Sequence, residues 1–195
     1  MKDEVPTRLL IINKKGEFLD KVTLLDNAKG TVEHLFEYIT GSLTEVTFHV
    51  YAAEDIKAAD GVSEDYFKAD ELVGTITTDT NGIAQLGDLP VGKYYVKEAE
   101  TVHGYVLDGE PRYVDLSYRD QDTPVVTYDE AWQNNRQKVK VTVLKKEKDT
   151  ERVLAGGIFG LFTREDIKNV GGDVLMEADT LIELKTTDEN GQITF

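Results

Sequence analysis

Apolar and polar residues alternate along most of the chain, in short stretches. The clearest examples are 46–51, 73–78, 94–98, 113–118 and 125–134. A period of two is typical of a β-strand with one buried side and one solvent-facing side, whereas a helix repeats every 3.6 residues. Glycine, proline, asparagine and aspartate separate the stretches, as turns require. The pattern therefore predicts an all-β chain.

One stretch departs from this alternation. Within residues 31–40, apolar side chains recur at helical spacing, at Val32, Leu35, Phe36 and Ile39. Gly41 follows directly, and glycine is a common helix stop. We therefore expect a short amphipathic helix at 31–40, inserted into the β-plan and covering one end of a sheet.

Two parts of the chain resemble one another. Residues 78–82 read Thr-Asp-Thr-Asn-Gly, and residues 187–191 read Thr-Asp-Glu-Asn-Gly. The segments 69–72 and 178–181 also correspond, as Ala-Asp-Glu-Leu and Ala-Asp-Thr-Leu. Such self-similarity predicts a tandem repeat of one module. The Asn-Gly pair at the end of the first motif also predicts a β-hairpin turn.

The number and spacing of the expected strands favour a β-sandwich in each copy. The second copy ends at Phe195, before any counterpart of the 87–105 stretch. We therefore predict a first domain at 1–137, with the helical insertion, and the N-terminal part of a second, truncated repeat at 138–195. This organisation leads us to expect that the chain is a piece of a longer array.

Composition narrows the possible functions. The chain of 195 residues has 37 acidic and 22 basic side chains, with a formal net charge of −15 at pH 7. Such acidity repels phosphate backbones and anionic lipids, so we expect neither nucleic acid nor membrane contact. Because there is no cysteine, disulfides, zinc–thiolate sites and cysteine nucleophiles are excluded. Its three histidines are scattered, and we expect no metal and no cofactor.

The most specific motif runs from residue 77 to residue 105. It joins the Asn-Gly turn to a Leu-Pro-Val-Gly turn at 89–92, a strand ending at Glu98, and a Gly-Tyr pair at 104–105. The motif resembles the B-type repeat domains of Gram-positive collagen adhesins and SpaA-like pilins. The resemblance covers about 48–195 well and the first strands more loosely. It implies tandem prealbumin-like, immunoglobulin-like β-sandwiches from a surface stalk.

The same resemblance implies a self-crosslinking reaction. Many members of that family join a lysine on the first strand to an asparagine on the last strand, and an acidic residue on a middle strand promotes this isopeptide bond. Glu98 matches the acidic residue. Asn134 matches the asparagine, because it shares strand parity with Trp132, and Asn135 is the alternative.

The lysine is harder to assign. Lys14 follows Leu10 and Ile12 on one strand parity and is our choice, with Lys15 as the alternative. In the second copy, Lys145 precedes a Leu-Ala-Gly-Gly-Ile-Phe run at the family's spacing. Its partners are missing from the truncated copy, so no bond is expected there.

The chemistry is physically reasonable. A lysine amine must be neutral to attack an amide carbon, and burial disfavours its charged form. We expect Glu98 to hydrogen-bond the asparagine carbonyl and to relay protons to the departing ammonia. The reaction occurs once per chain, so the protein is not expected to be an enzyme. A covalent tie between terminal strands would stabilise the fold much as a disulfide does.

Two other functions compete with a structural stalk. A ligand-binding module would recognise a host protein or glycan through the insertion and the 54–71 loop. Tyr66 and Phe67 are the candidate contacts in that loop, although packing in a small satellite core is the simpler interpretation. An enzyme could pair Asp108 with Glu110 as glycosidases do, but the sequence gives no reason to place them in a cleft.

The stalk hypothesis also predicts location and partners. We expect an extracellular protein anchored to the cell wall, with the signal and the anchor outside this chain. The expected partners are neighbouring repeats of the same chain, and a host matrix protein or glycan.

Overall fold

The computed structural model describes residues 7–26, 31–58, 60–118 and 125–195. All the regular structure in these ranges is β-strand, which confirms the prediction of an all-β chain. Each strand begins and ends close to a change in the alternating pattern, because strands with one buried face need apolar side chains at every second position.

The chain divides into two compact units. The first unit contains Met1–Glu17 and Thr40–Gln137, and the second contains Phe18–Ile39 and Lys138–Phe195. The predicted domains, 1–137 and 138–195, differ from this division in the placement of residues 18–39, which the structure groups with the second unit.

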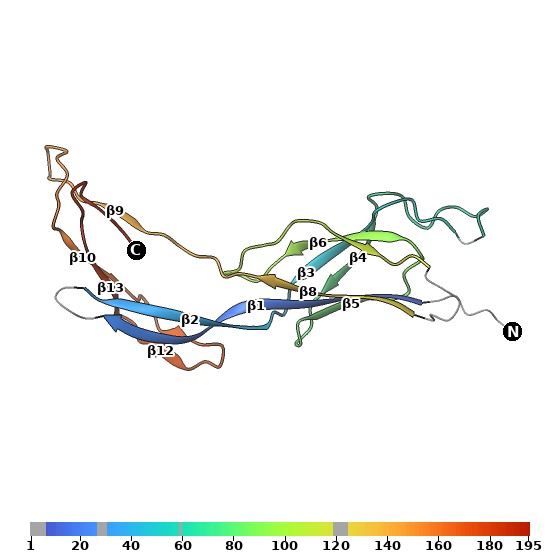
Figure 1. Cartoon of the computed structure of the whole chain (residues 1–195), viewed down its shortest axis with the longest axis horizontal. Helices are drawn as coiled ribbons and strands as arrows, with labels where there is room; N and C mark the ends of the chain where they lie inside the picture. Colours follow the sequence, from blue (N-terminus) through green and yellow to red (C-terminus); the bar gives the residue numbers. More distant parts are fainter. Residues whose placement is uncertain (1–6, 27–30, 59, 119–124) are drawn as a thin grey trace. The chain divides into compact units, whose positions relative to one another are not determined.

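The first unit is built on two sheets (Figure 1). One sheet has the order β2-β1-β5, and β8 also pairs with β1. The other sheet has the order β4-β3-β6-β7. The strand bounds are β1 Thr7–Asp26, β2 Glu33–Ser42, β3 Thr47–Ala52, β4 Leu72–Thr77, β5 Ile83–Leu86, β6 Lys93–Glu100, β7 Arg112–Asp115 and β8 Val125–Asn134.

The helix expected at 31–40 is wrong, because these residues extend into strand β2. The side chains of Val32, His34 and Phe36 are half-buried and those between them are exposed, which is the period of a strand. A helix of about ten residues is marginal without tertiary support, because nucleation costs more than so few hydrogen bonds return. The β-branched and aromatic residues here favour an extended backbone, and β1 supplies the pairing partner.

The turn at 79–82 is present, but it does not close a hairpin. The Asp79 carboxylate accepts hydrogen bonds from the backbone N–H groups of Asn81 and Ile83, at 2.8 and 2.9 Å. The strands on either side then enter different sheets, since β4 pairs with β3 and β5 pairs with β1. The turn therefore links the two layers of the first unit.

The core of the first unit lies between its two sheets. Side chains from both sheets are at most 1% exposed there: Leu10, Ile12, Val46, Phe48, Val50, Tyr94, Val96, Val114, Leu116 and Trp132. The rings of Phe48 and Trp132, from opposite sheets, meet edge to face with centroids 5.1 Å apart. This face-to-face packing is that of a β-sandwich.

The second unit contains six shorter strands. Their bounds are β9 Thr142–Leu144, β10 Ile158–Phe162, β11 Ile167–Lys168, β12 Val174–Met176, β13 Leu181–Thr186 and β14 Gln192–Thr194. β9 pairs with β14, β10 with β13, and β11 with β12, each antiparallel. The first two pairs correspond to β1 with β5 and to β3 with β4 in the first unit.

The internal repeat is visible in the backbone hydrogen bonds of each unit. The Lys14 N–H donates to the Gly82 carbonyl at 2.7 Å, and the Lys145 N–H donates to the Gly191 carbonyl at 2.7 Å. The Thr78 and Thr187 hydroxyls donate to the carbonyls of Leu43 and Leu154, both at 2.9 Å. The matching sequence motifs thus make matching contacts.

Candidate functional site

Three polar side chains meet inside the apolar core of the first unit. Lys14 comes from β1, Glu98 from β6 and Asn134 from β8, and these residues are at most 3% exposed. The parallel register between β1 and β8 pairs Lys14 with Trp132 and Gly16 with Asn134, so both functional side chains lie on the inner face of one sheet. Glu98 reaches them from the opposite sheet.

The three side chains form a closed set of hydrogen bonds. The Lys14 Nζ donates to Glu98 Oε2 at 2.6 Å and to Asn134 Oδ1 at 2.7 Å. The Asn134 Nδ2 donates to Glu98 Oε1. The reverse orientation of the amide would point its N–H donors at the lysine amine and its oxygen at the carboxylate, so the contacts determine how the amide lies.

Aromatic rings enclose the lysine amine. Its Nζ lies 5.6 Å from the ring centroid of Phe48 and 5.9 Å from that of Trp132. Burial lowers the pKa of Lys14 below its ordinary value, against the opposing effect of the hydrogen bond and charge of Glu98. The site therefore favours the neutral amine, which is the nucleophilic form.

The contacts of Glu98 differ from the expected ones. We predicted a hydrogen bond to the asparagine carbonyl, whereas the carboxylate accepts from Lys14 Nζ with one oxygen and from Asn134 Nδ2 with the other. The carbonyl oxygen of Asn134 instead accepts from Lys14. Glu98 thus touches both the attacking nitrogen and the leaving nitrogen, an arrangement suited to moving a proton from one to the other.

Sequence reasoning missed three residues around this site. Thr101 accepts a hydrogen bond from Asn134 Nδ2 at 2.9 Å, and Phe48 forms part of the apolar wall. The Arg112 guanidinium stacks over the outer ring of the wall, 4.2 Å from the Trp132 centroid. Each contact joins strands that are distant in sequence, so no local spacing signals it.

The alternative residues lie elsewhere. Lys15 is half-buried and points to the other side of β1 from Lys14, as strand alternation requires. Asn135 is exposed, and its carbonyl accepts the backbone N–H of Val106 at 3.0 Å. In the second unit Lys145 is exposed, and none of the described residues hydrogen-bonds its side-chain amine. The structure therefore brings Lys14 and Asn134 together with Glu98, and not these alternatives.

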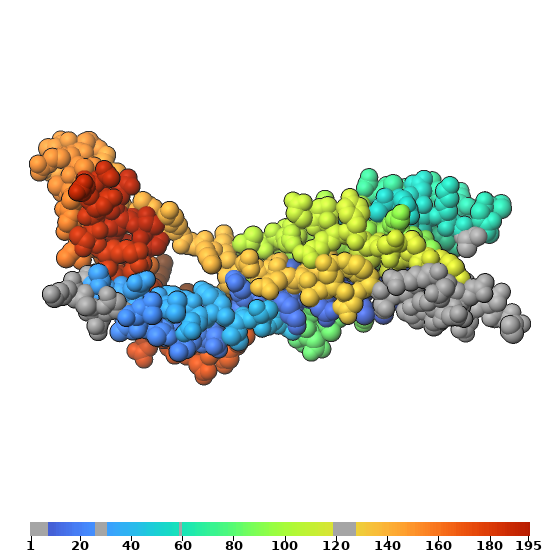
Figure 2. All heavy atoms as spheres, viewed as in Figure 1, coloured from blue at the N-terminus to red at the C-terminus, as the bar shows by residue number. Residues whose placement is uncertain are grey.

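The 54–71 loop has a small core of its own. Ile56 is 1% exposed and forms an isolated β-bridge with Phe67, whereas Tyr66 is 54% exposed. The loop forms part of the surface at one end of the first unit, in teal in Figure 2. Of the two predicted contact residues, Tyr66 is thus available to a ligand and Phe67 packs within the loop.

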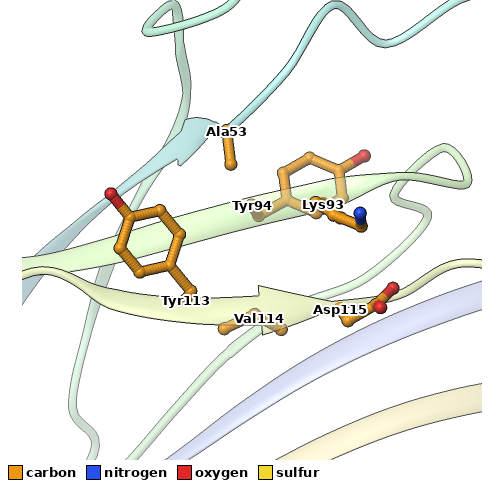
Figure 3. Close-up of a pocket in the computed structure, with 6 residues that line it drawn as sticks. All are labelled: Ala53, Lys93, Tyr94, Tyr113, Val114 and Asp115. Carbon is orange, nitrogen blue, oxygen red and sulfur yellow. The ribbon is translucent and has the colours of Figure 1, made fainter.

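A shallow hollow lies on the outer side of the second sheet of this unit. It has a volume of about 280 Å³, and Figure 3 shows that its lining comes from β6, β7 and the end of β3: Ala53, Lys93, Tyr94, Tyr113, Val114 and Asp115. A row of tyrosines leads to it across three strands. Tyr51 stacks on Tyr95 at 5.0 Å, and Tyr95 meets Tyr113 at 5.8 Å with a tilt of 50°.

Tyr113 ends this tyrosine row and is 70% exposed. It is therefore the aromatic ring of the row that is most accessible beside the hollow.

The described residues offer little support for other chemistry. The Asp108 carboxylate, one of the pair considered for a glycosidase, accepts a hydrogen bond from Arg112 at 3.0 Å and so is engaged in an ion pair. The described ranges contain no group of three or more histidine or acidic side chains placed to hold a metal ion. They also contain no helix that is long and apolar enough to cross a membrane.

Comparison with known families gives one match. Residues 37–131 match the SpaA prealbumin-like fold domain. The match includes Glu98, but it includes neither Lys14 nor Asn134, which lie on the flanking strands. No curated protein matches the chain by sequence.

Solved structures show a similar fold. The TIE protein of Bacillus anthracis is 22% identical over 97% of this chain and 26% of its own length, with a TM-score of 0.54. A minor pilin of Streptococcus agalactiae is 21% identical over 69% of this chain and 46% of its own, with a TM-score of 0.41. The shaft pilin SpaA of Lactobacillus rhamnosus GG, as a double mutant, is 18% identical over 96% and 81%, with a TM-score of 0.38. The chain thus spans about a quarter of the TIE protein and less than half of the minor pilin.

Proposed function

Residues 37–131 form a SpaA prealbumin-like fold domain, and from this premise we propose that the chain is a structural stalk or adhesion module of a Gram-positive cell-surface protein. It is extracellular and belongs to a protein anchored to the cell wall. Its partners are neighbouring repeats of the same chain. It has no enzymatic turnover on an external substrate.

The observation that carries the proposal is the buried set of Lys14, Glu98 and Asn134. A lysine and a glutamate with fully buried side chains are costly to keep as an ion pair, because desolvation can exceed the Coulomb gain. Here the pair holds an amide within hydrogen-bond distance of the amine. This geometry supports a self-catalysed isopeptide bond between Lys14 Nζ and Asn134 Cγ.

The reaction needs no outside reagent. A proton first moves from the Lys14 ammonium to the Glu98 carboxylate, and the neutral amine then attacks Asn134 Cγ. The attacking nitrogen gives a second proton to the leaving nitrogen, with Glu98 as the relay. The C–N bond to Nδ2 breaks and ammonia departs. The remaining proton stays on Glu98 or leaves as part of an ammonium ion.

The bond would serve a stalk mechanically. β1 and β8 are parallel neighbours, and they carry the first and last strand segments of the first unit. A covalent link between Lys14 and Asn134 lets tension pass directly from one strand to the other, so the sheets between them bear none of it. The cysteine-free chain has no disulfide that could do the same.

Intact mass tests the proposal. The folded chain should be lighter than its sequence mass by one ammonia, about 17 Da, and the Glu98→Ala variant should have the full mass. Only one ammonia should be lost, because Lys145 has no partners in this chain. A native chain of full sequence mass would rule out the crosslink.

Glycan or host-protein binding is a second candidate function, favoured by the hollow beside Tyr113. An exposed ring next to a lysine and an aspartate offers a flat apolar face with hydrogen-bonding groups around it, as sugar rings require. A glycan and matrix-protein array should show binding that Tyr113→Ala abolishes. Tyr118→Ala, at a tyrosine that is 52% exposed, is the matched control and should bind normally. An array without signal would remove this function.

A further inference from the structure

The leaving nitrogen of the proposed reaction has two hydrogen-bond acceptors. Asn134 Nδ2 donates to Glu98 Oε1 and to Thr101 Oγ1, the latter at 2.9 Å. A primary amide nitrogen carries two N–H donors, so both are engaged. With its oxygen also held by Lys14, the amide cannot rotate away from the attacking amine.

Thr101 occupies a distinct position in this cluster. It follows directly after β6 (Lys93–Glu100) and is half-buried, whereas the three reacting residues are at most 3% exposed. It is therefore the member of the hydrogen-bonded set that reaches the surface of the unit. Water that is excluded from Lys14 by the aromatic wall can approach the cluster from the Thr101 side.

We propose that Thr101 is a catalytic residue of the isopeptide reaction: its hydroxyl holds the leaving nitrogen and receives the ammonia on its way to solvent. The inference rests on the proposed function, because it concerns the same reaction. Thr101 forms no covalent bond and supplies no proton. Its oxygen accepts an N–H of the amide before the reaction and an N–H of ammonia after it, while Glu98 delivers the additional proton.

The test follows the reaction as the chain is made. The full chain is produced by cell-free synthesis, translation is stopped, and intact mass is recorded over time to give the rate of ammonia loss. Thr101→Val keeps the shape of the side chain and removes the acceptor, so the rate should fall roughly tenfold, the factor associated with one neutral hydrogen bond. Thr101→Ser restores the hydroxyl and should react within about threefold of the native rate.

Two further measurements separate catalysis from folding. In a Lys14→Met background, where no bond forms, Thr101→Val should leave the midpoint of thermal unfolding unchanged, since the surrounding core is untouched. The pH dependence of the rate should keep its midpoint in Thr101→Val, because that midpoint belongs to Lys14 and Glu98.

The outcomes are distinguishable. A native rate in Thr101→Val, or a slow rate in Thr101→Ser, would overturn the role of Thr101 while leaving the crosslink intact. Absence of ammonia loss from the native chain would overturn the proposed function itself.

Discussion

The Lys14 amine lies 2.6 Å from the Glu98 carboxylate, and neither side chain is exposed to solvent. The contact has two consequences that share one cause. Desolvation makes the charged pair expensive, and it also favours transfer of the proton from the amine to the carboxylate. Bond formation with Asn134 then removes the lysine charge permanently. The buried pair is therefore best understood as the precursor of a crosslink.

The choice of partners on each strand is the first prediction. Lys14→Ala and Asn134→Ala should each give a chain of full sequence mass, because the nucleophile or the amide is missing. Lys15→Ala and Asn135→Ala are the matched controls and should still lose about 17 Da. Tandem mass spectra of the native chain should contain one branched peptide joining the two strands. Retention of the mass loss in Lys14→Ala would assign the bond to another lysine.

The second prediction concerns stability. A bond between Lys14 and Asn134 closes a loop with a sequence separation of 120 residues, and chain entropy gives such a loop about 4–5 kcal/mol. The double variant Lys14→Met with Glu98→Gln removes the bond and both buried charges together. Its thermal unfolding midpoint should lie roughly 10–20 °C below that of the native chain.

The double variant is the appropriate comparison because a single substitution would leave one buried charge unpaired and exaggerate the loss. Equal midpoints for the native chain and the double variant would mean that no stabilising crosslink is present.

The third prediction concerns pH in a chain that cannot crosslink. In Asn134→Ala the amine of Lys14 remains, and burial lowers its pKa below the ordinary 10.5. Between the lowered pKa and 10.5 the unfolded chain binds more protons than the folded chain, so the free energy of unfolding rises with pH. This contribution is complete above 10.5 and is lost as the pH falls to the folded-state pKa.

Urea unfolding of Asn134→Ala at a series of pH values measures this slope. The same series in a variant that also carries Lys14→Met isolates the contribution of the lysine from those of other groups. The difference between the two series should increase with pH across that window, and a decrease would show that the folded state holds the proton on Lys14.

The fourth prediction concerns the turn that supports the lysine. Gly82 has a φ of +74°, and a Cβ there would lie 2.6 Å from the carbonyl oxygen of Lys14. Gly82→Ala should therefore lower the free energy of unfolding by about 2–4 kcal/mol, through backbone strain and displacement of β1. Gly61→Ala is the control, because its φ is +66° but no atom lies within 4 Å of the added Cβ.

Urea denaturation of both variants in the Lys14→Met, Glu98→Gln background gives the two free energies without interference from the crosslink. We expect Gly61→Ala to cost about 1 kcal/mol, for the left-handed backbone alone. Equal costs at the two positions would show that the contact between Gly82 and Lys14 has no energetic weight.

Local sequence was sufficient for much of this picture. Period-two alternation placed the strands, because a strand buried on one face needs that period whatever its partners are. The same parity put Lys14 in line with Leu10 and Ile12, and Asn134 in line with Trp132, so both functional side chains were expected on inner faces. Resemblance to a family, rather than spacing, supplied the role expected of Glu98.

Tertiary structure alone decided the remainder. The apolar residues of 31–40 fit a helix and a strand equally well, and pairing with β1 selects the strand. Residues 79–82 form the expected turn, but the pairing of β5 with β1 sends the chain into a second sheet. The surroundings of Lys14 likewise depend on strands that are distant in sequence: Phe48, Thr101 and Arg112 reach the site because two sheets pack face to face. Short-range patterns record which way a side chain points, whereas only the packing of the sheets records what it meets.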